Sequence, residues 1–163
     1  MKIAFDITPL QSGHKSRGIG SYTHNLLSEL KKNKFLEVLE FTDIKSISNV
    51  DLVHYPYFDL FFHTLPIRKR FPTVVTIHDV TPLIFPKQYP KGLKGLINFR
   101  LQKFALQGID GIITDSDSSK KDIRRYLGIP AERIYPIHLA IDSEFKKLPK
   151  EQLIKTKSKY NLP

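Results

Sequence analysis

Short apolar runs alternate along the chain with longer segments in which apolar residues recur every three or four positions. Runs rich in β-branched and aromatic residues predict strands, and helical spacing of apolar residues predicts amphipathic helices. The predicted strands cover residues 2–7, 35–41, 50–55, 73–77, 111–114 and 131–137, and the predicted helices cover residues 21–32, 91–107 and 119–127. Strands that alternate with helices in this way predict an α/β fold with a doubly wound, mainly parallel sheet and helices on both faces.

Turn residues and caps mark the segments between these elements. Residues 8–20 are polar and contain glycines, which predicts a long loop that feeds the first helix. Ser119 and Asp122 form a candidate capping box for the third helix, and Gly128 ends that helix. The aromatic residues 56–62 fit neither the strand nor the helix pattern, so the sequence predicts no regular structure for them.

Length and composition indicate one domain. The chain has 163 residues, of which 40% are hydrophobic, enough to form a single core. Residues 149–163 have few apolar residues and many lysines, so we predict a domain over residues 1–148 followed by a linker or frayed end. The absence of cysteine excludes disulfides, thiolate metal sites and thiol nucleophiles. No apolar run approaches the roughly 18 residues of a membrane span, so we expect a soluble protein without a signal peptide.

The helix over residues 91–107 combines an apolar stripe with a basic side. The stripe, which we expect to cover the sheet, consists of Leu93, Leu96, Ile97, Leu101, Phe104 and Ala105. The formal net charge of the chain is +10, which suits an anionic partner or serves solubility alone. Contact of the basic side and of residues 68–71 with an anionic membrane stays an open alternative. No recognition helix or base-stacking motif indicates nucleic acid.

His78 and Asp79 follow the buried strand over residues 73–77. Ligands bind at the carboxyl ends of strands in an open α/β sheet, so both are candidate site residues. The two side chains could form a hydrogen-bonded pair that moves a proton near neutral pH, or His78 could be structural. His54 and His138 end two other strands, but their long separations make a three-histidine metal site a weak hypothesis.

The first strand-to-helix connection carries Arg17, Gly18, Gly20 and Tyr22. The two glycines would let a phosphate approach the backbone N–H groups at the start of the helix. Thr23 stands where the dinucleotide fingerprint has its third glycine, so this is not a standard nicotinamide or flavin site. A flexible loop without a ligand is the other interpretation.

Asp115, Ser116 and Asp117 follow the strand over residues 111–114. Two carboxylates at this spacing could hold Mg²⁺ or Mn²⁺, which prefer oxygen ligands. Aspartate and serine also cap helices, and the sequence favours this capping role because a predicted helix follows. Binding of a nucleotide sugar through a metal at Asp115 and Asp117 remains a separate hypothesis.

Five segments taken in order resemble the amino-terminal half of the retaining family 4 glycosyltransferases of the GT-B fold, of the glycosyl transferase group 1 type. They are residues 3–6, 17–27, 78–83, 114–123 and 140–145, the last with Ala140 where the family has glycine. In that family two Rossmann-like domains face each other across a cleft. The amino-terminal domain mainly binds the acceptor, and the carboxyl-terminal domain binds the nucleotide-sugar donor.

The resemblance implies a catalytic role for His78, which would reach the transferred sugar. It further implies substrate-binding roles for Arg17, Gly18, Gly20, Tyr22, Asp79 and Ser116, and it implies transfer without a metal ion or other cofactor, with the nucleotide sugar as co-substrate. The basic pair and the two-glutamate motif of the family's donor domain do not occur in the chain. We therefore expect an acceptor-side half whose donor-binding half is missing, either as an excised domain or as a subunit of a split enzyme.

On this interpretation the 163 residues alone are inactive, and the complete enzyme works in the cytoplasm, with contact at the inner face of the membrane left open. Its acceptor would be a saccharide or a lipid-linked molecule. The alternative from another class is a non-catalytic Rossmann-like module that binds anionic lipid or nucleic acid through its basic face. Salt would weaken nucleic-acid binding steeply, whereas it would leave a sugar site unaffected.

Overall fold

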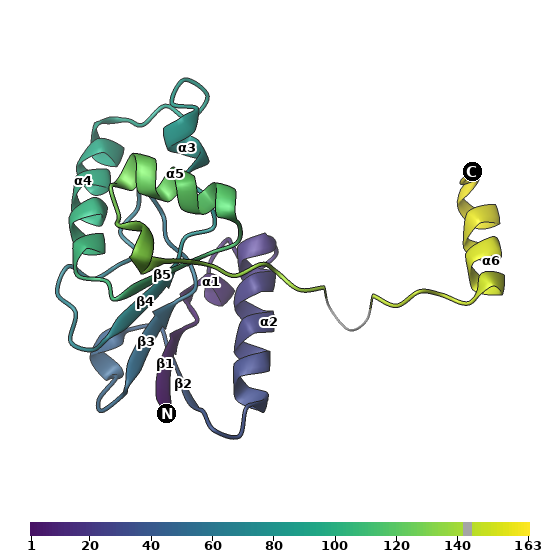
Figure 1. The fold of residues 1–163 in the computed structure, drawn as a ribbon, viewed down its shortest axis with the longest axis horizontal. Coiled ribbons are helices and arrows are strands. Elements are labelled where there is room, and N and C mark those ends of the chain that lie inside the picture. The colour runs from purple at the N-terminus through teal and green to yellow at the C-terminus, as the bar shows by residue number, and fades with distance from the viewer. Residues whose placement is uncertain (142–144) are drawn as a thin grey trace.

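A single six-stranded sheet organises the molecule (Figure 1). The computed structural model describes residues 1–141 and 145–163. All strand pairs are parallel, and the order across the sheet is β2-β1-β3-β4-β5-β6. The strands are β1 (Lys2–Asp6), β2 (Glu37–Phe41), β3 (Leu52–Tyr55), β4 (Thr73–Thr76), β5 (Gly111–Thr114) and β6 (Ile134–Pro136). The predicted α/β, doubly wound sheet is confirmed.

Helices cover both faces of this sheet. The α-helices are α1 (Thr8–Gln11), α2 (Gly18–Lys32), α3 (Thr81–Ile84), α4 (Leu93–Gln107), α5 (Asp117–Leu127) and α6 (Lys150–Tyr160), and two 3₁₀ turns are η1 (Ile44–Ser46) and η2 (Ala131–Arg133). In Figure 1, α2 lies on one side of the strands and α4 on the other. The main apolar cluster contains Ala105 and Leu106 of α4 and Ile123 of α5, together with alternate residues of the strands.

Strand β1 lies inside the sheet between β2 and β3, so the winding of the chain reverses at the β1–β3 boundary. Both faces of the strand are covered, because Ala4 and Phe5 point to opposite sides and neither is exposed. In doubly wound sheets this reversal opens a crevice at the carboxyl ends of the strands. Asp6 and Tyr55 end the two strands that border it.

The start of α2 differs from the prediction. The helix begins at Gly18 rather than at residue 21, and α1 forms within the predicted loop over residues 8–20. Gly20 is buried, and a Cβ atom built there would lie 2.4 Å from the backbone oxygen of His14 and 2.5 Å from that of Lys15. Gly20 is therefore needed for close backbone packing, which a pattern of hydrophobic positions does not show.

Helix α4 presents a different face to the core than predicted. Gln102, Ala105 and Leu106 are buried, whereas the apolar stripe expected to cover the sheet is largely exposed. Hydrogen bonds of Gln102 explain this orientation of the helix. Its side chain donates from Nε2 to the Phe62 carbonyl at 2.7 Å and accepts the Leu65 N–H at 3.3 Å. These hydrogen bonds satisfy backbone groups of the preceding connection, and this pairing lets an amide side chain lie in the core.

Residues 56–62 form an irregular but packed segment. The Asp59 carboxylate accepts the N–H groups of Phe61 and Phe62 at 2.7 and 2.9 Å, and this turn buries Phe58 and Leu60 in the main core. Their aromatic character therefore serves the core without a regular strand or helix.

The segment predicted as a linker or frayed end contains helix α6. Helix α6 has no buried residue, and Asn161 in the left-handed conformation ends it. The lysine-rich composition of this segment is compatible with both structures, because an exposed helix and a flexible segment contain similarly few apolar residues. None of the helices in residues 1–141 and 145–163 has the length and hydropathy that crossing a membrane requires.

The Gly20→Ala substitution is expected to lower the free energy of unfolding by about 1–3 kcal/mol, because the new methyl group overlaps backbone atoms that cannot easily retreat. Urea denaturation measures this change. Gly18→Ala is the matched control, because nothing lies within 4 Å of a Cβ at that position in the same helical turn. Equal stability of the two variants would contradict the packing role of Gly20.

Candidate functional site

A histidine and an aspartate meet where β4 and β5 end. These strands are neighbours in the sheet, and His78 follows β4 by two residues while Asp115 directly follows β5. His78 Nδ1 and Asp115 Oδ2 are 2.7 Å apart, and both side chains are mostly buried. Because a carboxylate oxygen only accepts, His78 Nδ1 carries the proton and donates it to this hydrogen bond. The Asp115 carboxylate therefore sets the orientation and the tautomer of the imidazole.

The hypothesis that His78 pairs with Asp79 is wrong. Asp79 is exposed, and its Oδ1 accepts the Thr81 N–H at 2.7 Å at the start of α3. Successive residues of an extended chain point to opposite faces of a sheet, so Asp79 points away from His78. Asp115 follows the adjacent strand β5 and lies on the same face as His78. The partner is thus a neighbour across the sheet rather than along the chain.

Two buried polar atoms of the His78–Asp115 pair are unpaired. Within residues 1–141 and 145–163, His78 Nε2 and Asp115 Oδ1 have no hydrogen-bond partner and no contact with solvent. In the neutral ring Nε2 is a hydrogen-bond acceptor, because Nδ1 holds the proton. Contact between Nε2 and a ligand requires a side-chain movement in this part of the site.

Tyr22 connects α2 to this pair. Its ring meets the His78 ring edge-on with centroids 4.7 Å apart, and its hydroxyl lies 3.1 Å from Thr76 Oγ1. Thr76 Oγ1 also lies 3.0 Å from His54 Nε2. Burial raises the pKa of Tyr22 and lowers the pKa of His54 to about 4, so both side chains are neutral at pH 7.

The three imidazoles at the strand ends have separate surroundings. His54 is buried and bonded to Thr76, His78 is bonded to Asp115, and His138 is exposed with Nε2 3.8 Å from Asp117 Oδ2. In the part of the chain that the structure describes, no three histidine or acidic side chains gather as a metal site.

Ser116 caps α5. Its Oγ accepts the Ser119 N–H at 3.1 Å, so the helix begins at Asp117, earlier than the predicted box of Ser119 and Asp122. Gly128 ends the helix in the left-handed conformation, as predicted. Asp115 pairs with His78, whereas the exposed Asp117 has its Oδ2 3.8 Å from His138 Nε2.

The predicted anion site at the start of α2 is partly occupied by the protein itself. The Gly20 N–H donates to the His14 carbonyl at 3.1 Å, so it is not available to a phosphate. Gly18 is exposed with open space around it, and Arg17, the residue that precedes the helix, is also exposed. Arg17 and Gly18 thus remain accessible, whereas Gly20 has a packing role.

A cavity of about 720 Å³ opens at the carboxyl ends of β1, β2 and β3, where the winding reverses. Its wall combines aromatic rings with ionisable groups, among them Asp6, Arg17, Tyr55, Tyr57, Asp59 and Phe62. Sequence reasoning selected only Arg17 of these residues. Asp6 and Tyr55 end their strands, so the rule that ligands bind at strand ends, applied to β1 and β3 as well as β4, would have found them.

The electrostatics of this cavity are set by burial. Burial raises the pKa of Asp6, whose carboxylate accepts the N–H of Thr8 at 2.9 Å. The Tyr57 hydroxyl donates to Asp59 Oδ2 at 2.6 Å, and burial together with this carboxylate raises the pKa of Tyr57. The charges of Arg17 and Asp79 also act on Tyr57, which links the cavity to the segment after His78.

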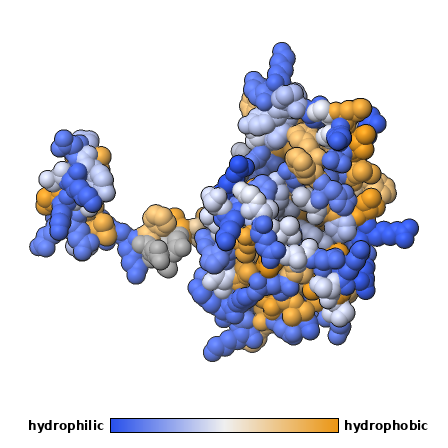
Figure 2. All heavy atoms as spheres, turned by 180° about the vertical axis from the view of Figure 1, so that it is seen from behind, coloured by the Kyte–Doolittle hydropathy of each residue, from blue (hydrophilic) through white to orange (hydrophobic). Residues whose placement is uncertain are grey.

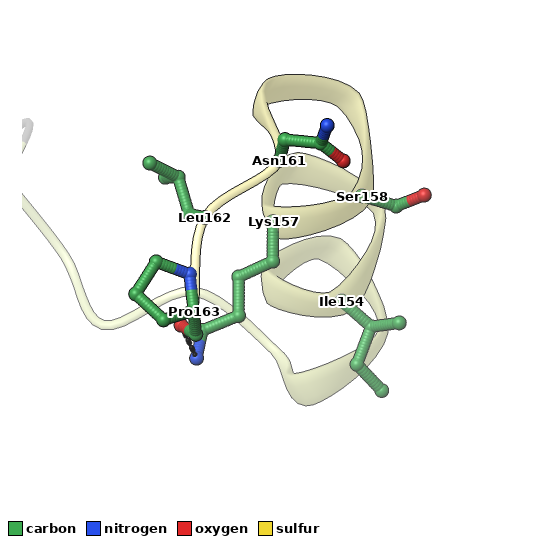
Figure 3. A pocket seen from close by; sticks show the side chains of 6 residues that line it. All are labelled: Ile154, Lys157, Ser158, Asn161, Leu162 and Pro163. Carbon is green, nitrogen blue, oxygen red and sulfur yellow. Dashed lines mark hydrogen bonds between the residues drawn. The ribbon is translucent and has the colours of Figure 1, made fainter.

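A second hollow, of about 470 Å³, lies on α6 and is formed by Ile154, Lys157 and the residues after the helix (Figure 3). The Lys157 ammonium donates to the Pro163 carbonyl across it at 2.5 Å. The hollow contains none of the candidate site residues, so the strand ends remain the candidate site.

A six-stranded parallel sheet with interleaved helices and a winding reversal defines a Rossmann-like domain, with a cavity at the edge where such folds bind ligands. The family model of Glycosyltransferase Family 4 matches residues 35–145, which is more than half of the chain. The chain therefore belongs to glycosyltransferase family 4, as the resemblance indicated, and its fold is that of the amino-terminal half typical of GT-B proteins. Membership implies transferase activity with a nucleotide-sugar donor and an acceptor.

The matched residues include His78, Asp79 and Ser116, but the match begins at residue 35, after Arg17, Gly18, Gly20 and Tyr22. No curated protein matches the chain. The segment over residues 140–145, part of the family resemblance, includes residues 142–144, which lie outside the described residues.

The stability of the protein should fall as the pH drops from 8 to 5, because burial lowers the pKa of His54 from 6.5 to about 4 and the unfolded chain then binds the proton more readily. His54 should contribute about 2 kcal/mol to this fall in the free energy of unfolding between the two pH values. Urea denaturation at both pH values measures it.

In the His54→Gln variant this contribution should disappear, because the amide does not titrate and can still bond to Thr76. His24→Gln is the matched control, since His24 is an exposed residue of α2. The same pH dependence in His54→Gln and in the wild type would contradict the burial of a neutral His54.

Proposed function

We propose that this chain is the acceptor-binding half of a retaining, metal-independent glycosyltransferase that moves a sugar from a nucleotide-sugar donor to a saccharide or lipid-linked acceptor. The observation that carries the proposal is the cavity at the winding reversal, at the same carboxyl edge of the sheet as the His78–Asp115 pair, in a domain of a glycosyltransferase family. Residues 1–148 form the acceptor side, and residues 149–163 lead toward a donor-binding domain. The 163 residues alone are expected not to turn over.

The composition of the cavity wall supports a saccharide acceptor. Tyr55, Tyr57 and Phe62 offer ring faces for the apolar C–H side of a sugar. Asp6 and Asp59 offer carboxylate oxygens, which can only accept, and sugar hydroxyls are donors. Arg17 supplies donors for a sugar oxygen or for the phosphate of a lipid-linked acceptor.

In the transfer, the oxygen of the acceptor hydroxyl bonds to the anomeric carbon of the donor as the bond from that carbon to the phosphate oxygen breaks. The nucleoside diphosphate leaves with the electron pair, and the hydroxyl proton passes to the leaving phosphate oxygen. Because the configuration at the anomeric carbon is retained, the acceptor hydroxyl must approach on the same face as the leaving phosphate. The protein accelerates this step by holding the acceptor there and by stabilising the charge that develops.

His78 would bind a hydroxyl of the transferred sugar through Nε2. Nδ1 donates to Asp115, which leaves Nε2 as the ring nitrogen available to the sugar, so Asp115 is a positioning residue. Tyr22 limits the tilt of the ring by its edge-on contact. Gly18, Asp79 and Ser116 would line the substrate path through backbone groups or their side chains. The proposed place of action is the cytoplasm.

Replacing His78 by alanine should lower kcat by about 100-fold or more, because a contact made to the reacting sugar is lost. Asp115→Ala should lower kcat less, and Asp115→Asn should recover part of the loss, since the amide oxygen still accepts the Nδ1 proton. Transfer is measured with the full-length gene product, a panel of nucleotide sugars and EDTA.

The matched control is Asp117→Asn, a change at an exposed carboxylate two residues from Asp115, which should keep wild-type turnover. Full activity of a folded His78→Ala enzyme would remove His78 from the site. Loss of wild-type transfer in EDTA, restored by Mn²⁺, would instead support the metal hypothesis for Asp115 and Asp117.

Arg17→Ala should raise the KM for the acceptor about tenfold and leave the KM for the donor unchanged, because a charge-assisted hydrogen bond in the cavity is lost. Lys15→Ala is the matched control, since Lys15 is exposed nearby but does not line the cavity. A rise in the donor KM alone would assign Arg17 to the nucleotide sugar and contradict acceptor binding in this cavity.

A further inference from the structure

Helix α4 carries an exposed apolar face. Leu93, Ile97, Leu101 and Phe104, which we call the α4 outer face, are 77%, 53%, 40% and 64% exposed. Their spacing of three or four residues aligns them along one side of the helix. Figure 2 views the molecule from behind and shows hydrophobic side chains along its right-hand margin, the side on which α4 lies after the half turn. Such a continuous patch marks an interaction surface more often than scattered exposed residues do.

The surroundings of the α4 outer face are basic. Between Asp79 and Asp110 the chain has no acidic residue and five basic ones, which are Lys87, Lys91, Lys94, Arg100 and Lys103. Two more exposed cations, Arg68 and Arg70, belong to the connection that contacts the end of α4, because Lys69 donates to the Ala105 carbonyl. The apolar stripe is therefore framed by positive charge alone.

The opposite side of α4 is firmly held. Gln102 is fully buried and hydrogen-bonded to the connection over residues 59–65, and the Lys91 ammonium lies over the rings of Phe61 and Phe99 at 5.7 and 5.0 Å. The apolar side chains of the outer face cannot turn into the core without breaking these contacts. The exposure is thus a fixed property of the fold.

We propose that the α4 outer face docks on the surface of an anionic lipid bilayer. Leu93, Ile97 and Phe104 insert among the lipids, and the exposed basic side chains Lys94 and Arg100 of α4 lie at the headgroups. Helices with an apolar side and a basic margin lie in the membrane interface in this way. A second copy of the chain fits less well, because two such faces would bring many like charges together. The inference does not depend on the transfer reaction.

The chain contains no tryptophan, so Phe104→Trp places a single reporter on the face. On addition of vesicles of phosphatidylcholine and phosphatidylglycerol, the tryptophan emission should shift to the blue. Vesicles of phosphatidylcholine alone should cause a much smaller shift, because each basic residue near an anionic surface adds about fivefold to the binding. Ile154→Trp on α6 is the matched control, at an exposed apolar position outside the face, and should show no shift.

Flotation with the same vesicles tests the face itself. The double variant Ile97→Glu and Phe104→Glu should lose binding by about 100-fold, because two inserted side chains become anionic. The double variant Leu153→Glu and Ile154→Glu on α6 adds the same charge and should lose far less. Circular dichroism establishes that each variant is folded.

Three results would overturn the proposal. They are equal binding by the two double variants, the absence of any binding to anionic vesicles, and a dimer in solution that only the Ile97→Glu and Phe104→Glu changes dissociate. The last result would assign the face to a second copy of the chain. Because none of these measurements uses sugar transfer, a failed transferase assay leaves the outcome unaffected.

Discussion

The placement of β1 between β2 and β3 is the constraint on which the site depends. A strand paired on both sides and covered on both faces needs an apolar middle, and β1 meets this with Ile3, Ala4 and Phe5 between its charged ends, Lys2 and Asp6. The chain can then only continue beyond the carboxyl edge, and the connections after β1 and β3 separate there. The cavity, the start of α2 and the His78–Asp115 pair all lie at this edge as a result.

The architecture follows from patterns that any parallel sheet imposes, which is why the six strands and the α/β class could be predicted. The predicted element boundaries were less accurate where backbone packing determines them. At Gly20 the backbone packs closely against His14, and α2 begins at Gly18, earlier than predicted. The orientation of α4 could not be predicted, because periodicity places every glutamine outward. Gln102 is buried by hydrogen bonds to backbone groups that become its neighbours only in the fold.

In the candidate site, too, individual residues could be predicted from the sequence, whereas their tertiary neighbours could not. The rule for strand ends identified His78 from the sequence, but its partner could not be chosen between Asp79 and Asp115 without knowing that β4 and β5 are adjacent. The family match includes His78 and Asp115 but not the connection around Arg17. The cavity wall combines three segments distant in sequence, so no local motif describes it.

The floor and the walls of the cavity have different structural roles. Strands β1 and β3 form the floor and are needed for the core, whereas the walls come from connections such as residues 8–17 and 56–66. Substitutions in a wall can alter the shape and charge of the cavity while the sheet pairing stays intact. Such a division would let the specificity of this cavity, for the acceptor that we propose, diverge among relatives during evolution without a cost to folding.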